Sequence, residues 1–281
     1  MGENARRDIV LTLEDMGFEV ESSHHEVAPA QHEVDFKYAD ALTTADNMQT
    51  FKMAVKTVAK RHGLHATFMP KPKLECDGSG LHLNLSLHKD GKNVFHDPTD
   101  ELGLSKEAYY FIGGLMAHIQ AMTVVFNPLV NSYKRLVPGF EAPVYTAWSA
   151  KSKNHLIRIP VSNAESTRIE LRSPDPSANP YLAFAAALRA GLDGIKNQIE
   201  PPAQLDCHIA SLSAKEREDA KAFTLPDTLA AAISASKQDP FMKEILGEVG
   251  FAKYIENKEK DWNEYRAVVT DWEINKYLYR Y

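Results

Sequence analysis

Leucine alternates with polar residues through residues 81–87, and this segment has the clearest hydrophobic pattern in the chain. A period of two residues is typical of a β-strand with one buried face. The leucines would face a core, and the other face would present His82, Asn84 and Ser86. An imidazole, an amide and a hydroxyl, placed directly after the glycine-rich turn at residues 77–80, indicate the floor of a binding site.

Two other segments carry polar faces of the same kind. Residues 24–38 place a glutamate on either side of Pro29. Because proline argues against one continuous helix, we expect a strand, a turn and a second strand there. Residues 168–172 alternate as residues 81–87 do. The three polar faces together present these ionisable side chains: Glu26, Glu33, His82, Arg168, Glu170 and Arg172.

Carboxylates with one imidazole suit Mg²⁺ or Mn²⁺, and arginines suit phosphate or carboxylate groups. Ligands for a metal and for an anion on one surface suggest phosphoryl chemistry. Each segment taken alone also fits a bland interpretation. A polar strand face can simply be solvent-exposed, Arg-x-Glu-x-Arg at 168–172 can be an ion-pair ladder on one face, and His24 and His25 can be surface residues.

The remaining pattern predicts an α+β fold, in which helices cover the outer face of an antiparallel, curved sheet. Apolar residues at helical spacing and helix-ending residues predict five helices, over residues 5–17, 45–62, 105–126, 181–199 and 225–246. Strands are also expected at 18–23 and 66–69. Residues 131–155, rich in Gly, Pro and Ser, are expected to loop over the site, and residues 201–223 form a polar connection.

Composition is consistent with this fold, and it limits the cellular compartment and the partners that we expect. The 281 residues contain 44% hydrophobic and 25% charged residues, as in soluble globular proteins. We see no apolar run approaching ~20 residues and no signal-peptide core, which argues against a membrane partner. Two cysteines, Cys76 and Cys207, suit the reducing cytoplasm. A net charge of −6 gives no reason to expect nucleic acid.

A series of motifs then connects the chain to a known family. In chain order they are His-His-Glu-Val-Ala-Pro at 24–29, Gln-His-Glu at 31–33, Met-Pro-Lys-Pro at 69–72, Gly-Ser-Gly-Leu-His at 78–82, Asn-Pro through Asn-Ser-Tyr-Lys-Arg-Leu at 127–136, Pro-Gly-Phe-Glu-Ala-Pro at 138–143, Ile-Arg-Ile-Pro at 157–160, and Asp-Pro through Asn-Pro-Tyr-Leu at 175–182. Their order and spacing resemble the C-terminal catalytic domain of bacterial type I glutamine synthetase, over essentially the whole chain.

The resemblance implies one catalytic domain over residues 1–281, with the glutamine synthetase and guanido kinase-like fold. It implies an activity that joins ammonia to the γ-carboxylate of glutamate through γ-glutamyl phosphate, with ATP as phosphoryl donor and two Mg²⁺ or Mn²⁺ sites. Glu26 and Glu33 would bind one metal, and His82 and Glu170 the other. These four residues are also the ligands that the strand faces suggested.

The remaining roles follow from the same resemblance. Arg135 and Arg172 match arginines that hold glutamate and the transferring phosphate, and Gly78 and Asp77 lie in the glutamate-binding loop. Glu141 matches a flap carboxylate that closes the site and helps to deprotonate ammonium. Arg158 matches a contact to both substrate and nucleotide. The other nucleotide positions implied are Glu21, Tyr38, Asn84, Ser86, Lys153 and Arg168.

Three residues depart from the family pattern. Lys153 stands where arginine is usual, so the charge remains but the bidentate fork is lost. Glu75 replaces a usual glycine and Asp77 a usual asparagine. The two acidic residues leave open a relative that joins glutamate to another amine.

The largest departure is at the N-terminus. The family begins with a β-grasp domain and a Glu-x-Glu strand that adds a carboxylate to each metal, and the chain starts after both. We therefore expect a catalytic-domain fragment with impaired activity, from a protein whose full-length form is a homo-oligomer, a dodecamer in this family. A non-catalytic truncated homologue with a binding or regulatory role is the remaining alternative.

Overall fold

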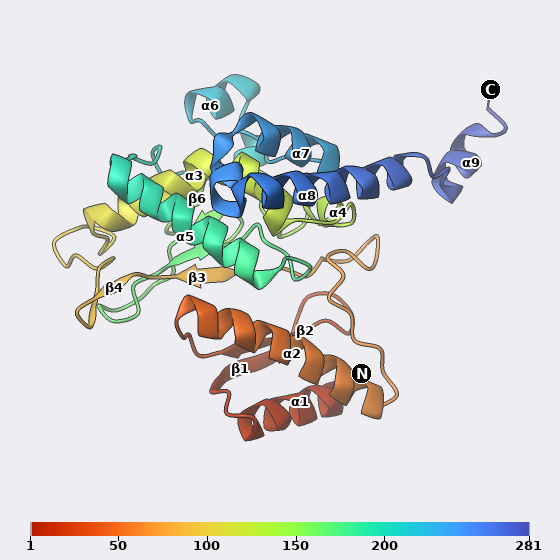
Figure 1. The fold of residues 1–281 in the computed structure, drawn as a ribbon, viewed down its shortest axis with the longest axis horizontal. Coiled ribbons are helices and arrows are strands. Elements are labelled where there is room, and N and C mark those ends of the chain that lie inside the picture. Colours follow the sequence, from red (N-terminus) through yellow and green to blue (C-terminus); the bar gives the residue numbers. More distant parts are fainter. Residues whose placement is uncertain (1, 281) are drawn as a thin grey trace.

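The main core lies between a mixed four-stranded sheet and a layer of helices (Figure 1). The computed structural model describes residues 2–280. The strands lie in the order β3 (Leu83–Leu85), β8 (Ile169–Leu171), β7 (Ile157–Arg158) and β6 (Trp148–Ser149). The β3–β8 and β8–β7 pairs are antiparallel, whereas β7 and β6 are parallel. The architecture is α+β as predicted, with one parallel pair that was not.

Two long helices cover the apolar face of the sheet, α3 (Lys106–Phe126) and α5 (Pro180–Asn197). They pack backbone against backbone, since a Cβ on Gly114 would lie 2.0 Å from the Ala190 carbonyl oxygen and one on Gly194 would lie 2.0 Å from that of Tyr110. Glycine is required at both positions because any side chain would force the helices apart.

Among residues 2–280, α3 is the one helix that is long and apolar enough to cross a membrane by length and composition alone. Our expectation that no segment approaches this limit was therefore wrong for α3. The reason is its position, because 67% of its most apolar window is buried inside the protein. A core helix needs the same apolar composition as a membrane span, so this helix is weak evidence for a membrane.

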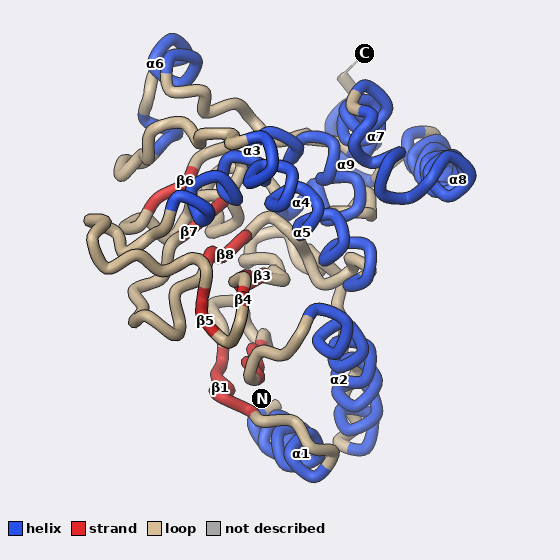
Figure 2. Tube along the Cα trace, turned by 60° about the vertical axis from the view of Figure 1, so that its left-hand side comes forward, coloured by secondary structure: helices blue, strands red, loops and turns tan. Residues whose placement is uncertain are grey.

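A smaller core holds the N-terminal part together. It lies between α1 (Glu3–Asp15), α2 (Ala41–Arg61) and the hairpin formed by β1 (Val20–His25) and β2 (His32–Phe36). Figure 2 shows α1 and α2 beside this hairpin, away from the larger helical layer. The hairpin confirms the strand, turn and strand that Pro29 predicted.

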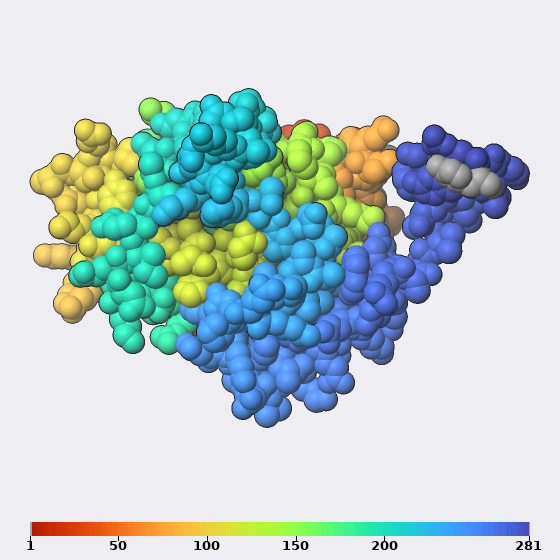
Figure 3. Space-filling view, turned by 90° about the horizontal axis from the view of Figure 1, so that it is seen from above, coloured from red at the N-terminus to blue at the C-terminus, as the bar shows by residue number. Residues whose placement is uncertain are grey.

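The remaining strands and helices follow in chain order. They are β4 (His88–Lys89), β5 (Lys92–Asn93), α4 (Ser132–Arg135), the short 3₁₀ helix η1 (Ile209–Ser211), α6 (Ala214–Asp219), α7 (Leu229–Gln238), α8 (Pro240–Arg266) and α9 (Asp271–Tyr277). The C-terminal segment with α9 extends from one side of the main body (Figure 3).

Two predicted elements were wrong and others were incomplete. Residues 66–69 form no strand, because they lead into Pro70 and pair with no neighbouring strand. The helix predicted over 225–246 is two helices, since Asp239 caps α8 and Pro240 cannot continue α7. The loop at 131–155 contains α4 and β6, and the connection at 201–223 contains η1 and α6. The other four helices are confirmed within a few residues.

Candidate functional site

A cleft of about 1250 Å³ opens between the N-terminal hairpin and the four-stranded sheet. The residues predicted for the site come from distant parts of the chain, and all but Lys153 line this cleft. Those that line it are Glu21, Glu26, Glu33, Tyr38, Asp77, Gly78, His82, Asn84, Ser86, Arg135, Glu141, Arg158, Arg168, Glu170 and Arg172. Lys153 is exposed in the loop between β6 and β7 and lies outside the lining.

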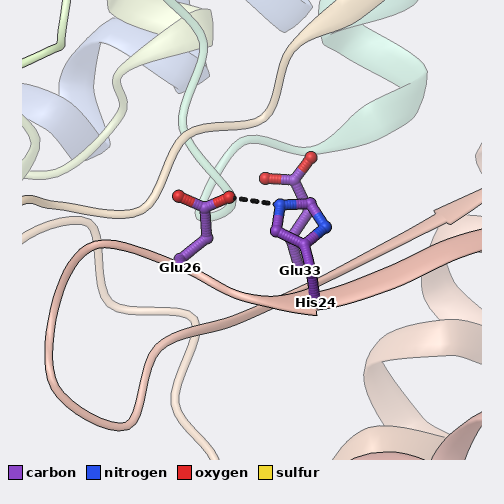
Figure 4. Close-up of side chains that lie close together, drawn as sticks. All are labelled: His24, Glu26 and Glu33. Carbon is purple, nitrogen blue, oxygen red and sulfur yellow. Dashed lines mark hydrogen bonds and ion pairs between the residues drawn. The ribbon is translucent and has the colours of Figure 1, made fainter.

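One end of the cleft holds an acidic cluster on the hairpin. Potential ligand atoms of His24, Glu26 and Glu33 all lie within 4.8 Å of one another. His24 and Glu33 are register partners in β1 and β2, and Glu26 follows directly after β1. Figure 4 shows these side chains converging, with His24 Nε2 2.7 Å from Glu26 Oε1. From sequence alone His24 fits a surface residue equally well, because its position opposite Glu33 depends on the hairpin register.

The carboxylates of this cluster repel one another. Burial raises the pKa of Glu33 to about 8, helped by the neighbouring carboxylates of Asp35 and Glu26. Burial acts in the same direction on Glu26, but hydrogen bonds with His24 and Glu33 outweigh it and lower the Glu26 pKa. A divalent cation between the two glutamates would favour the ionised form of both and offset their repulsion, so the residues present suit Mg²⁺ or Mn²⁺.

The sheet end of the cleft has the opposite balance of charge. Glu170 is only 6% exposed and has three cationic or polar neighbours. Its carboxylate lies 3.3 Å from His82 Nδ1, 3.0 Å from Arg158 Nη1 and 3.4 Å from Arg172 Nε. Burial raises the Glu170 pKa, but the interactions with His82, Arg172 and Arg158 dominate and bring it to about 2.

These contacts bear on two earlier interpretations. The ion-pair ladder suggested for residues 168–172 is present in part, since Arg172 pairs with Glu170, whereas Arg168 donates to Asn84 Oδ1 at 3.0 Å. His82 and Glu170 are adjacent as a metal-binding pair would be. A metal ion between them would compete with both arginines for the Glu170 carboxylate.

Arg135 is held rigidly at the base of the cleft. It lies on α4, is 3% exposed, and donates to the carbonyl oxygens of Ser173 at 2.7 Å and Arg172 at 3.0 Å. Burial lowers its pKa to about 10, against the opposing effect of Asp175. A guanidinium fixed in this way is well placed to hold an anionic group with little loss of conformational entropy.

The loop at 70–80 closes tightly over Arg135. A Cβ on Gly78 would lie 2.4 Å from the Pro70 carbonyl oxygen and 3.0 Å from Arg135 Cγ, so no other residue fits there. Gln31 from the hairpin donates to the Gly78 carbonyl at 3.0 Å. These contacts connect the hairpin, the loop and α4 around one side of the cleft.

Glu141, which the resemblance predicts to be a flap carboxylate, also meets this loop. The Glu141 backbone N–H donates to Asp77 Oδ1 at 3.2 Å. The Glu141 carboxylate lies close enough to Arg172 to raise the pKa of that guanidinium, although burial, the larger effect, lowers it. Glu141 therefore lies at the cationic end of the cleft.

Five of the positions predicted for nucleotide contact are partly or fully exposed residues of the cleft lining, namely Glu21, Tyr38, Asn84, Ser86 and Arg168. Asn84 and Arg168 are bonded to each other across β3 and β8. Tyr38 is 72% exposed, and its ring centroid lies 6.4 Å from that of His88. Such an exposed aromatic ring can stack on a planar base.

Comparisons with known proteins agree with this geometry. A family model described as "Glutamine synthetase, catalytic domain" matches residues 1–277. Glutamine synthetases from Clostridium saccharobutylicum and Staphylococcus aureus (strain MW2) are 55% and 53% identical over 281 residues, which is 100% of this chain and 63% of each relative. The chain thus spans a little under two thirds of the length of the curated relatives it matches.

Solved structures show the same relationship. A GmaS/ADP complex has a TM-score of 0.89 and 40% identity, covering 98% of this chain and 63% of that chain. Plasmodium falciparum glutamine synthetase has a TM-score of 0.88 and 31% identity, covering 99% of this chain and 62% of that chain. The chain belongs to the glutamine synthetase family and matches its catalytic domain.

Proposed function

We propose that this chain is one catalytic domain, residues 1–281, of a ligase that joins ammonia to the γ-carboxylate of glutamate. ATP would phosphorylate that carboxylate, and ammonia would displace phosphate from γ-glutamyl phosphate to give glutamine. The observation that carries the proposal is the division of charge within one cleft. The carboxyl groups of Glu26 and Glu33 lie at one end, and the guanidinium groups of Arg135, Arg158 and Arg172 lie at the other.

The first step brings two anions together, the glutamate carboxylate and the γ-phosphate. Arg135 and Arg172 would hold the carboxylate and the transferring group, and Arg158 would contact both substrate and nucleotide. Fixed cations reduce the repulsion and stabilise charge in the transition state. Mg²⁺ or Mn²⁺, held by Glu26 and Glu33 with His24 beside them and by His82 and Glu170, would neutralise the phosphates when bound.

The second step needs ammonia rather than ammonium, and it must exclude water. Glu141 would accept the proton from ammonium, because its carboxylate lies near Arg172, where glutamate would bind. Closing the flap over Asp77 and Gly78 would shield the acyl phosphate from hydrolysis. The nucleotide would lie along the rim formed by Glu21, Tyr38, Asn84, Ser86 and Arg168, and Lys153 would reach it only if its loop moved inward.

The proposal includes the cellular compartment, the assembly and the partners of the enzyme. We infer a cytoplasmic protein that works as a homo-oligomer in its full-length form, and no membrane or nucleic-acid partner. The 281 residues supply Glu26 and Glu33 to one metal and His82 and Glu170 to the other, where the family uses a third carboxylate at each. We therefore infer that this chain alone is impaired as a ligase.

The test compares the 281-residue chain with a chimera that adds the N-terminal third of the Clostridium saccharobutylicum relative. Both would be incubated with ATP, glutamate, Mg²⁺ and either ammonium or methylamine, and glutamine and ADP would be measured. We expect the chimera to form glutamine and ADP in equal amounts, and the shorter chain to form little.

Two other results would redirect the assignment. Faster ADP formation with methylamine than with ammonium would favour a glutamate–amine ligase, for which the acidic pair Glu75 and Asp77 is the supporting observation. Binding of Mn²⁺ and ATP by the chimera without product from either amine would favour a non-catalytic protein.

A further inference from the structure

Lys71 lies buried within the loop at 70–80 (the substrate loop), against the segment at 138–143 that carries Glu141 (the flap), and no step described above uses it. It belongs to the Met-Pro-Lys-Pro motif at 69–72, and only 6% of the residue is exposed. Both backbone polar groups of Lys71, its N–H and its carbonyl, are hydrogen-bonded to the Asn131 side chain. The Lys71 N–H donates to Asn131 Oδ1 at 2.8 Å, and Asn131 Nδ2 donates to the Lys71 carbonyl at 3.0 Å. The side chain therefore extends from a rigid base.

The ammonium group of Lys71 has two partners on different segments. It donates to the Cys76 carbonyl oxygen in the substrate loop, and it lies 3.4 Å from the centroid of the Phe140 ring in the flap. A buried cation over an aromatic face is stabilised by the ring quadrupole, and more so when water is excluded. One side chain thus connects the loop that precedes Asp77 with the residue that precedes Glu141.

A second contact joins the same two segments. Asp77 Oδ1 accepts the Glu141 backbone N–H at 3.2 Å. Two neighbouring flap residues, Phe140 and Glu141, are therefore each bonded to a side chain of the 70–80 loop. Two anchors on consecutive residues fix the direction in which the Glu141 carboxylate projects, whereas one anchor would allow the flap to rotate about it.

We propose that Lys71 is a positioning residue that holds the flap closed and aims Glu141 into the cleft. The Lys71–Phe140 contact breaks when the flap opens, which exposes a desolvated cation to water, and it re-forms when the flap closes. This inference rests on the proposed function only for what Glu141 does. The contact of Lys71 with Phe140, called the latch below, is itself a property of the folded chain.

Hydrogen–deuterium exchange of the 281-residue chain tests the latch without any turnover. The amides of Phe140, Glu141 and Ala142 report on the flap, and the Glu141 amide is itself one of the bonded groups. Lys71→Met keeps the length and removes the charge. It should speed exchange of the Glu141 amide roughly ten-fold, the size expected for losing one buried cation–π contact. Lys71→Arg should restore most of the protection.

Lys73→Met is the matched control, because Lys73 lies two residues away on the same loop and is exposed. It should leave flap exchange unchanged. Phe140→Leu removes the ring from the other side of the contact at a half-buried position, so it should speed exchange as Lys71→Met does. The double variant should be no faster than either single variant, as expected for two halves of one contact.

Three results would overturn the latch. The first is unchanged flap exchange in Lys71→Met, and the second is faster exchange that extends equally into α3 and β3, which would mean general loss of stability. The third is additive effects in the double variant, which would rule out a shared contact. In the chimera, Lys71→Met should raise the KM for ammonium while the Kd for ATP stays within about two-fold. A chimera that forms no glutamine would refute the proposed function and leave the exchange result standing.

Discussion

Arg158 and Glu170 face each other across neighbouring strands, as register partners in β7 and β8, with Arg158 Nη1 3.0 Å from Glu170 Oε2. Asn84 in β3 is the partner of Glu170 on its other side. Directly opposed residues of antiparallel strands point to the same face of the sheet. The backbone register therefore sets this polar row, and the cationic end of the cleft is as rigid as the sheet.

The pairing of Glu170 predicts a loss of stability in acid. Its pKa is about 2 in the folded chain against 4.5 ordinarily. A carboxylate with a lowered folded-state pKa stabilises the protein above its unfolded pKa, and this stabilisation is lost as pH falls from about 4.5 towards 2. Glu170→Gln should lower the free energy of unfolding at pH 6 by up to about 3 kcal/mol.

Urea unfolding at several pH values measures this effect. The gap between the wild-type chain and Glu170→Gln should narrow steadily as pH falls from 4.5 to 3. Glu165→Gln, at an exposed position in the loop before β8, should follow the wild type throughout. A gap that stays constant with pH would show that the Glu170 charge does not supply the stabilisation.

Glu33 should be required for metal binding. Because its pKa is raised to about 8, it is protonated at neutral pH, and a bound cation must displace that proton. Affinity for Mn²⁺ should therefore rise between pH 6 and 8 and change little above. Glu33→Gln should weaken binding at least about ten-fold, as measured by titration calorimetry. Glu19→Gln, whose carboxylate pairs with Lys37 on the hairpin, is the control and should bind normally.

Gly78→Ala should damage both folding and the site. The added Cβ would lie 2.4 Å from the Pro70 carbonyl oxygen, which is backbone and cannot rotate away. We expect a loss of about 1–3 kcal/mol in the free energy of unfolding, typical of overpacking. Gly250→Ala, within α8 and 3.8 Å from Leu246 Cβ, should instead be neutral or stabilising. Equal effects of the two substitutions on the thermal midpoint would contradict the close packing inferred for the 70–80 loop.

How far the sequence predicts this site is clearest at β3. Alternation over residues 81–87 predicts which side chains share a face, and Leu83 is indeed buried while Asn84 is exposed. Alternation says nothing about which strand pairs with which. The contact of Arg158 with Glu170 and the place of His24 opposite Glu33 both depend on register, so neither could be derived from local pattern.

The strand wrongly predicted at 66–69 has a similar cause, because strand pairing is not a local feature of the sequence. Thr67, Phe68 and Met69 favour a strand by composition, but a strand also needs a partner, and Pro70 ends any ladder. The contact of Lys71 with Phe140 joins residues far apart in the chain, so only the folded structure shows it. Local sequence determined the hairpin at Pro29 and helices α1, α2, α3 and α5 well, because their turns, caps and apolar stripes are local features.

Glu141→Ala separates the two proposed chemical steps. Its carboxylate would act only after phosphoryl transfer, so the chimera carrying this substitution should bind ATP nearly as the wild type does and lose glutamine synthesis by about 10²–10⁴-fold. Calorimetry of ATP binding and a glutamine assay measure the two quantities. Parallel losses of ATP affinity and turnover would instead make Glu141 a residue of the nucleotide site.

A crystal structure with Mn²⁺ and a non-hydrolysable ATP analogue tests the central claim most directly. Anomalous scattering locates manganese independently of the rest of the density. The account predicts one peak within bonding distance of the Glu26 and Glu33 carboxylates, a second between His82 and Glu170, and the triphosphate between these positions and Arg168. Manganese bound away from all four residues, or a nucleotide outside this cleft, would contradict it.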